Sequence, residues 1–188
     1  MKRIFVTLFL AGSLLAACSS GQNESAEPEF SGPWAAELEQ TYQRTTADFA
    51  KKVLAKGTIT DKDMAEAQQS VRQCMEDEGF TDITFNSDGS SSVADPQNRE
   101  QSKTESARTK CMAQVGYEDL EEVYYPMKIN PENLDFATII VDCLKDKGAV
   151  QQSFTVQDFD LMFQNDQEIP INQDILKECN TDPLGLNQ

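Results

Sequence analysis

The chain has 188 residues, a formal net charge of −16, a single tryptophan and no histidine. This length accommodates one modest domain, or a small domain with an appended segment. The lack of histidine excludes Ser-His-Asp and Cys-His nucleophilic sites, which need an imidazole base, and most catalytic zinc sites and haem pockets, which use imidazole as a ligand. The acidic charge argues against nucleic acid as a partner, because phosphate binding needs clustered lysine and arginine.

Residues 1–17 have the pattern of a secretory signal peptide. Two cations, Lys2 and Arg3, precede a short apolar run that gives way to small residues. The run is too short and too interrupted to be a stable membrane span. We therefore expect this segment to direct export and to be removed.

The end of the signal segment indicates a lipid anchor. It reads Leu15-Ala16-Ala17-Cys18, which resembles the lipobox of bacterial lipoproteins. The resemblance implies that the sulfur of Cys18 takes a diacylglycerol and that the chain is cut just before this residue. Two acyl chains hold a protein stably at a membrane without a transmembrane helix. The alternative is an ordinary signal peptide followed by a coincidental cysteine.

The mature chain divides into a tether and a domain. Residues 18–32 are polar and acidic and cannot bury enough apolar surface to order themselves, so they predict a flexible tether. Residues 33–188 predict a single globular domain on the outer face of the cell membrane. Removal of residues 1–17 leaves 14 basic and 32 acidic residues, a net charge of −18. Anionic lipids and wall polymers should repel such a domain.

Four cysteines remain in the predicted domain, and an even number in an exported chain predicts disulfide bonds. Neighbouring cysteines lie 37, 32 and 36 residues apart, without a C-x2-C pair or a histidine, so we predict no metal site and no cofactor. The four cysteines are Cys74, Cys111, Cys143 and Cys179.

An internal similarity favours one of the three connectivities that four cysteines allow. Residues 71–79 resemble residues 140–148, with cysteine, aspartate and glycine at matching positions. This pattern suggests two related helix–strand–helix halves, residues 58–117 and 130–180, each closed by its own bridge. The alternative is that a cysteine followed by a helix-ending glycine arose twice independently. The favoured pairs are Cys74–Cys111 and Cys143–Cys179.

The predicted fold is mainly α with short β-hairpin or strand segments (α+β). Apolar residues at mostly four-residue steps predict one amphipathic helix from Pro33 to Gly57. A capping box at Thr60 starts a second helix, and alternation over residues 80–85 with a turn signal at Asp88 predicts a hairpin. The later predictions are helices over 108–115, 118–125, 134–144, 159–163 and 172–179, and a second strand over 150–156.

A second resemblance extends over residues 49–148. The sequence there looks like small secreted lipoproteins of high-GC Gram-positive bacteria, and the shared features are helix caps and cysteines. The resemblance implies a compartment and an architecture and carries no catalytic residues to this chain. The positions that carry it are the run 53–63 leading to Cys74 and Gly79, and the run 130–133 leading to Cys143 and Gly148.

The sequence contains no P-loop, G-x-S-x-G, S-x-x-K or H-E-x-x-H motif. The only dense aromatic patch is Tyr117, Tyr124 and Tyr125, which predicts either a protein-contact surface or packing between the halves. We predict a non-enzymatic binding or assembly module with an envelope protein as partner. The alternatives are a carboxylate-dependent cell-wall glycan hydrolase and a small solute-binding lipoprotein.

Overall fold

The structure is a computed structural model that describes residues 28–86, 90–164 and 170–186. Within these ranges the protein is mainly helical with one short antiparallel hairpin, as the sequence predicts. The predicted signal peptide and Cys18 lie outside the described residues. The described elements are α1 (Ala35–Arg44), α2 (Asp48–Leu54), α3 (Asp61–Asp77), β1 (Thr81–Phe85), β2 (Ser91–Ala94), α4 (Gln101–Val115), α5 (Tyr117–Ile129), α6 (Phe136–Asp146), α7 (Val156–Gln164) and α8 (Gln173–Thr181).

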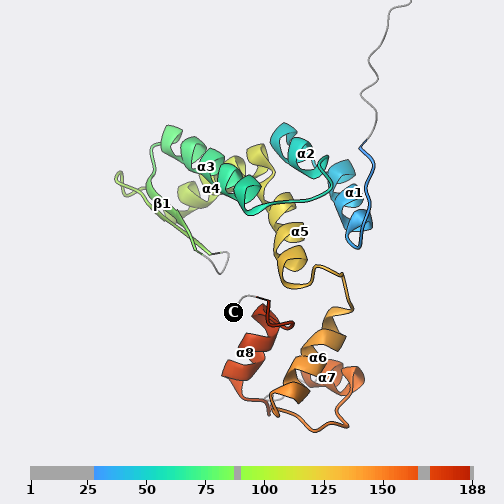
Figure 1. Ribbon diagram of the computed structural model, residues 1–188. Coiled ribbons are helices and arrows are strands. Elements are labelled where there is room, and N and C mark those ends of the chain that lie inside the picture. Colours follow the sequence, from blue (N-terminus) through green and yellow to red (C-terminus); the bar gives the residue numbers. More distant parts are fainter. Residues whose placement is uncertain (1–27, 87–89, 165–169, 187–188) are drawn as a thin grey trace, which may run out of the picture.

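The buried apolar residues form two separate cores. Eighteen of them, from Leu38 to Tyr124, form the first core between α1–α5 and the hairpin, and eight, from Ile140 to Cys179, form the second core between α6, α7 and α8. Figure 1 shows the two groups of helices on either side of the segment after α5. The boundary lies near residues 130–136, so the predicted first half, 58–117, contains only part of the first core.

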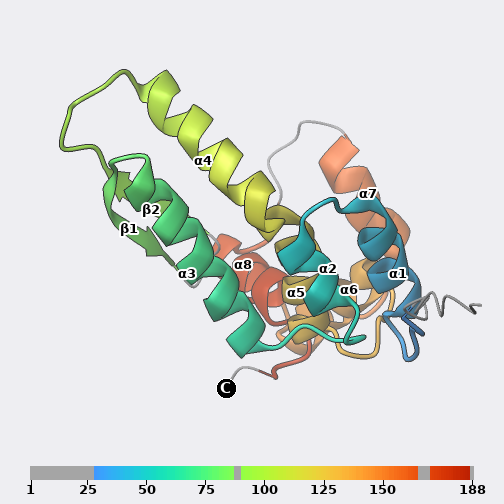
Figure 2. The ribbon, with the colours of Figure 1, turned by 90° about the horizontal axis from the view of Figure 1, so that it is seen from above.

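Helices α3 and α4 lie side by side, with the hairpin beside α3 (Figure 2). Helix α5 contacts each of α1, α2, α3 and α4 and is therefore the central element of the first core. The hairpin is confirmed where the sequence predicts it, with Thr84 opposite Ser92 and an irregular register between Thr81 and Thr84. The predicted turn at residues 88–89 lies outside the described residues.

The prediction of one long first helix is wrong. The chain is extended at Thr45 (φ −66°, ψ 141°), which separates α1 from α2. The physical reason lies in the close packing at Gly116, where a Cβ atom would lie 2.5 Å from the Cβ of Ala50 and 2.8 Å from the Cβ of Ala47. Because the helix is interrupted at Thr45, α2 takes a different direction from α1. The small side chains of Ala47 and Ala50 then pack against Gly116, between α4 and α5.

Helix α3 begins and ends where the sequence predicts. The Thr60 hydroxyl accepts a hydrogen bond from the N–H of Asp63, and the Asp63 carboxylate accepts one from the N–H of Thr60. This reciprocal pair is a capping box. At the other end Gly79 adopts φ +85°, and the N–H of Phe80 donates to the carbonyl of Met75 at 3.0 Å. Such a left-handed glycine is a common helix stop.

Helix α5 is longer than predicted because Pro126 does not end it. The helix continues to Ile129, and the N–H of Asn130 donates to the carbonyl of Pro126 at 2.9 Å. A proline inside a helix removes one backbone hydrogen bond, but the preceding turns are already packed in the first core. The added turn carries Lys128, which belongs to the candidate site described below.

The segment after α5 is tied down by the buried side chain of Asn130, which is 2% exposed. Its amide donates to the carbonyl of Leu134 at 2.7 Å, and its oxygen accepts from the N–H of the same residue at 3.0 Å. The indole N–H of Trp34 donates to the backbone carbonyl of Asn130 at 3.0 Å. The start of α1 therefore holds the segment that joins the two cores.

A second contact between α1 and the joining segment comes from Asn133, which adopts a left-handed backbone conformation (φ +49°). Its side-chain amide donates to the carbonyl of Pro33 and to the carboxylate of Glu37, both at 2.9 Å. Asparagine tolerates this conformation better than most residues. The joining segment is thus held by specific hydrogen bonds and not only by chain connectivity.

The second core differs from the prediction between α6 and α8. Residues 150–155 form turns and no strand, and α7 begins at Val156. The Thr155 hydroxyl accepts from the N–H of Asp158, and the Asp158 carboxylate accepts from the N–H of Thr155. This pair caps a helix start, which outweighs the apolar alternation that favoured a strand. The predicted helix–strand–helix pattern of the second half is therefore wrong.

Both predicted disulfides are present. Cys74 on α3 is bonded to Cys111 on α4, and Cys143 on α6 is bonded to Cys179 on α8, with Cα–Cα distances of 5.6 and 5.7 Å. Each core therefore has one bridge between two of its helices. The helix stops after Cys74 and Cys143 also match, since Gly148 adopts φ +67° and the N–H of the next residue returns to the last turn of α6.

Candidate functional site

The three tyrosines of the predicted aromatic patch occupy different environments. Tyr117 is 1% exposed and its ring lies 5.2 Å from that of Phe85, and burial raises the pKa of its hydroxyl to about 12. Tyr124 is buried, whereas Tyr125 is half-buried and lies edge-on to Tyr124 at 5.0 Å. Tyr117 is therefore a packing residue, and the surface of the patch is formed around Tyr124 and Tyr125.

The hydroxyl of Tyr124 belongs to a three-residue polar group. It donates to the carboxylate of Asp61 at 2.8 Å, and the ammonium of Lys128 lies 3.2 Å from both the Tyr124 oxygen and an Asp61 oxygen. The Lys128 ammonium also lies 5.5 Å from the centre of the Tyr124 ring. Asp61 opens α3, whereas Tyr124 and Lys128 stand four residues apart on α5, so one helix face presents both to the same carboxylate.

These contacts fix the charges of the group. The hydrogen bonds from Tyr124 and Lys128 hold the pKa of Asp61 below its usual value. Burial and the bond to Asp61 raise the pKa of Tyr124, and its bonds with Tyr124 and Asp61 raise the pKa of Lys128. At neutral pH the group therefore contains a carboxylate, an ammonium and a protonated phenol, and its net charge is zero.

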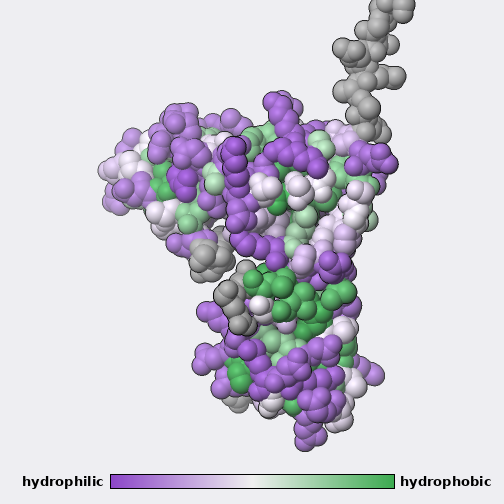
Figure 3. Space-filling model, viewed as in Figure 1, coloured by the Kyte–Doolittle hydropathy of each residue, from purple (hydrophilic) through white to green (hydrophobic). Residues whose placement is uncertain are grey.

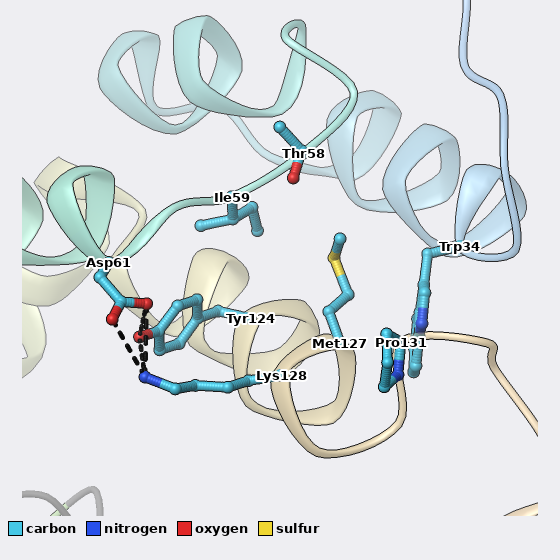
Figure 4. A pocket seen from close by; sticks show the side chains of 8 residues that line it. All are labelled: Trp34, Thr58, Ile59, Asp61, Tyr124, Met127, Lys128 and Pro131. Atoms are coloured by element: carbon cyan, nitrogen blue, oxygen red, sulfur yellow. Dashed lines mark hydrogen bonds and ion pairs between the residues drawn. The ribbon is translucent and has the colours of Figure 1, made fainter. Parts of the chain in front are cut away.

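A shallow groove of about 280 Å³ lies beside this group (Figure 4). Met127 and Ile59 lie between the polar group on one side and Trp34 with Pro131 on the other (Figure 4). Thr58 completes the lining. We call this space the α5 groove. Its walls come from four parts of the chain, namely the start of α1, the loop before α3, the end of α5 and the joining segment.

Two further hollows share residues with the α5 groove. One, of about 290 Å³, also has Asp61, Tyr124 and Lys128 in its lining and extends toward the hairpin. The other, of about 450 Å³, shares Trp34 and is otherwise mostly apolar, and we call it the junction groove. The residues that line the junction groove are Trp34, Tyr125, Pro126, Ile129, Asn130, Asn133, Leu134 and Phe136.

The described linings of these grooves combine apolar and aromatic side chains with a single carboxylate. Among the described residues that line the three hollows, Asp61 is the only carboxylate, and it is already paired. Glycosidic hydrolysis by the usual mechanism needs two carboxyl groups that face one another. Apolar and aromatic side chains with a few fixed polar groups are instead typical of binding sites.

A fourth groove, of about 470 Å³, lies in the second core region and has several acidic residues in its lining, namely Asp146, Glu178 and Asp182. Lys147 also lines it and forms an ion pair with Glu178 at 2.7 Å. Across the described ranges, no cluster of three or more His, Cys, Asp or Glu side chains has a geometry suited to a metal ion. This acidic groove is the place at which the hydrolase alternative can be tested.

Of the eight residues that line the α5 groove, the predicted aromatic patch contains only Tyr124, and Trp34, Asp61 and Lys128 are among those it missed. The four-residue spacing of Tyr124 and Lys128 was visible in the sequence and could have suggested a shared helix face. The contact with Asp61 joins residues 63 positions apart, and no local pattern indicates it.

Comparisons with known proteins give no match for this chain among protein-family models, curated proteins or solved structures. In the part of the chain that the structure describes, none of the helices has the length and apolar character needed to cross a membrane. The sequence signals and the surface of the protein itself are therefore the features that bear on its function.

Proposed function

We propose that this protein is a lipid-anchored, non-enzymatic binding module of the bacterial cell envelope. The lipobox that ends at Cys18 supports the anchor, and two disulfides support an oxidising compartment outside the cytoplasm. The acidic tether then places the domain within reach of partners at the outer face of the membrane. The partner expected from this position is another protein of the envelope.

The proposed binding role rests on one observation, namely that three shallow hollows with shared lining residues lie around the end of α5. Trp34 and Tyr125 offer partly exposed aromatic surface there, and aromatic residues are enriched at binding hot spots. The fixed group of Asp61, Tyr124 and Lys128 adds polar contacts whose charges cancel. A partner surface that combines apolar and uncharged polar groups matches this lining.

The test is photo-crosslinking in cells that carry the lipid-anchored protein. A crosslinking amino acid placed at Thr58, which is exposed and lines the α5 groove, should give one discrete adduct, identified by mass spectrometry. The matched control is Glu76, which is exposed on α3 and does not line the groove. The proposal predicts that the adduct disappears when Lys128→Ala is added. Equal adducts from both positions, or none from Thr58, would contradict it.

The hydrolase alternative makes a different prediction. If the acidic groove were catalytic, the purified protein would release reducing ends from cell-wall glycan, and Asp146→Asn would abolish this release. The small solute-binding alternative would show saturable binding of a low-molecular-weight ligand and no protein adduct at Thr58. Our proposal predicts no release of reducing ends from either the wild-type protein or the Asp146→Asn variant.

A further inference from the structure

The large apolar side chains that remain exposed are unevenly distributed along the chain. Among the described residues five are exposed by 37–52%, and all of them follow Asn130. Among the described residues of the first core region, which is much longer, there are none. The five residues are Leu134, Phe136, Leu161, Leu184 and Leu186.

Two of these side chains, Leu184 and Leu186, stand together on the segment after α8. On the side of the molecule shown in Figure 3, hydrophobic surface gathers in the second core region over the start of α6 and the segment after α8. Leu134 and Phe136 stand at the start of α6, and Leu184 and Leu186 stand after α8. We call Leu184 and Leu186 the apolar face. Leu134 and Phe136 also line the junction groove, whereas the two tail leucines do not line any of the three hollows around α5.

The tail that carries the two leucines forms a turn that is held by hydrogen bonds. The carboxylate of Asp182 accepts a hydrogen bond from the N–H of Leu186 at 2.8 Å, and the N–H of Gly185 donates to the carbonyl of Asp182 at 3.2 Å. Pro183 between them is buried. The turn therefore holds the backbone of Leu184 and Leu186 in place while their side chains stay exposed, so an apolar surface is presented at a reduced ordering cost at the time of binding.

The part of the chain that carries the apolar face is strongly negative. Residues 130–188 contain eleven acidic and three basic residues, a net charge of −8. Two of the three lysines are already paired within this region, Lys145 with Asp142 and Lys147 with Glu178. The acidic groove adjoins the face directly, because Leu184 lines it together with Asp146 and Asp182.

We infer that the apolar face and the adjoining acidic groove bind a basic amphipathic segment of a partner protein. Apolar side chains of the segment would cover the leucines, and its lysine or arginine side chains would meet the acidic rim, which is the usual arrangement of a buried centre and a polar rim. A second copy of this chain would bring two surfaces of the same negative charge together, and an anionic lipid surface would be repelled in the same way.

The experiment measures binding of defined peptides to the mature chain from residue 18, prepared with Cys18→Ala. The probe is an 18-residue peptide of leucine and lysine with leucines at helical spacing, labelled with a fluorophore. Two peptides serve as comparisons, one with glutamate in place of every lysine and one with the same composition in scrambled order. We expect saturable binding of the first peptide and at least about tenfold weaker binding of both others.

The decisive variant is Leu184→Gln/Leu186→Gln, because both side chains are exposed and their loss should leave the fold intact, as checked by circular dichroism. Affinity should fall about tenfold, with Leu186→Gln alone as a milder second variant. Leu161→Gln is the matched apolar control and should change affinity less than twofold. Asp146→Asn should weaken binding and reduce its salt dependence, whereas Glu76→Gln, an equal charge change on α3, should not.

Three results would overturn the inference. The first is equal binding of the ordered and scrambled peptides, which would indicate attraction by net charge alone. The second is unchanged affinity in the Leu184→Gln/Leu186→Gln variant. The third is a shift from dimer to monomer, or a loss of binding to anionic vesicles, in that variant without any effect on the peptide, which would assign the face to a second copy or to a lipid surface. The proposed role of the α5 groove is tested separately, by photo-crosslinking from Thr58.

Discussion

The two cores are closed by bridges of nearly equal span, 37 and 36 residues, but they differ greatly in size. The first buries eighteen apolar residues between five helices and a hairpin, and the second buries eight between three helices. All the large apolar side chains exposed in the described residues belong to the second region. A small core leaves more of its apolar surface uncovered, so a bridge or a partner is needed to supply the remaining stability.

The largest effect is therefore expected from removing the second bridge. Loss of a crosslink over 36 residues corresponds to about 4 kcal/mol in the chain-entropy estimate. In the Cys143→Ala/Cys179→Ala variant we expect α6–α8 to unfold at a much lower temperature than the first core. The fluorescence emission of Trp34, the only tryptophan, reports unfolding of the first core, whereas far-ultraviolet circular dichroism reports the loss of all helices. The melting curves recorded by the two methods should therefore separate.

The matched variant is Cys74→Ala/Cys111→Ala. It removes a bridge of the same span from the larger core, so the melting temperature should fall while the first core stays folded at 25 °C. Coincident Trp34 and dichroism transitions in the Cys143→Ala/Cys179→Ala protein would show that the two cores unfold as one unit, and the contrast drawn here would be wrong.

A second prediction compares two left-handed glycines, one in each region. Gly116→Ala places a methyl group 2.5 Å from the Cβ of Ala50 in addition to straining the backbone, and should cost about 3 kcal/mol. Gly148→Ala meets no atom within 4 Å and should cost only the backbone strain, about 1 kcal/mol. Denaturant unfolding measures both. Equal losses would mean that the contact at Gly116 relaxes easily.

The third prediction concerns the segment that joins the regions. Asn130→Ala removes a buried side chain and leaves the N–H and carbonyl of Leu134 without their partner at a partly buried site, which should cost about 2 kcal/mol. Trp34 bonds to the backbone of the same residue, so its emission maximum should shift as the segment loosens. An unchanged emission maximum together with unchanged stability would contradict the assigned role of Asn130.

The smallest effects are expected at the two capping boxes. Burial acts to raise the pKa of Asp63, but the hydrogen bonds from Lys56 and Thr60 outweigh it and hold this pKa below the usual value. A depressed carboxyl pKa gives stability that is present above the unfolded pKa of about 4 and is lost as the pH falls through the lower folded value. Asp63→Asn should cost about 1 kcal/mol at pH 7 and flatten the acid limb of the stability curve.

Asp158 is the matched position in the second region, where hydrogen bonds from Thr155 lower the pKa of an exposed carboxyl. Asp158→Asn should change stability less than Asp63→Asn, because water replaces the lost partner at an exposed site. Melting curves recorded between pH 2 and pH 7 compare the two variants. A steeper acid limb in Asp63→Asn than in the wild-type protein would reverse the sign argued here.

Local signals were enough to predict much of this fold. The capping box at Thr60 and the glycines after Cys74 and Cys143 set helix ends through contacts within a few residues, and the repeat of these features led to the correct disulfide pairs. The hairpin likewise follows from alternation and a turn signal. Each of these features is determined by neighbours in the sequence.

The remaining errors have non-local causes. The break at Thr45 depends on the close approach of α2 to Gly116, and α5 continues through Pro126 because its earlier turns are packed against four other helices. The α5 groove brings together Asp61 and Tyr124, which are 63 residues apart. Such contacts exist only after the chain has folded, so composition and spacing did not indicate them.

The central claim, that this is a lipid-anchored envelope protein, is tested most directly by the mass of the N-terminal peptide of the protein isolated from membranes. We predict a chain that begins at Cys18 and carries the mass of a diacylglycerol on that residue. An unmodified Cys18, or a mature chain that begins at any other residue, would contradict the claim.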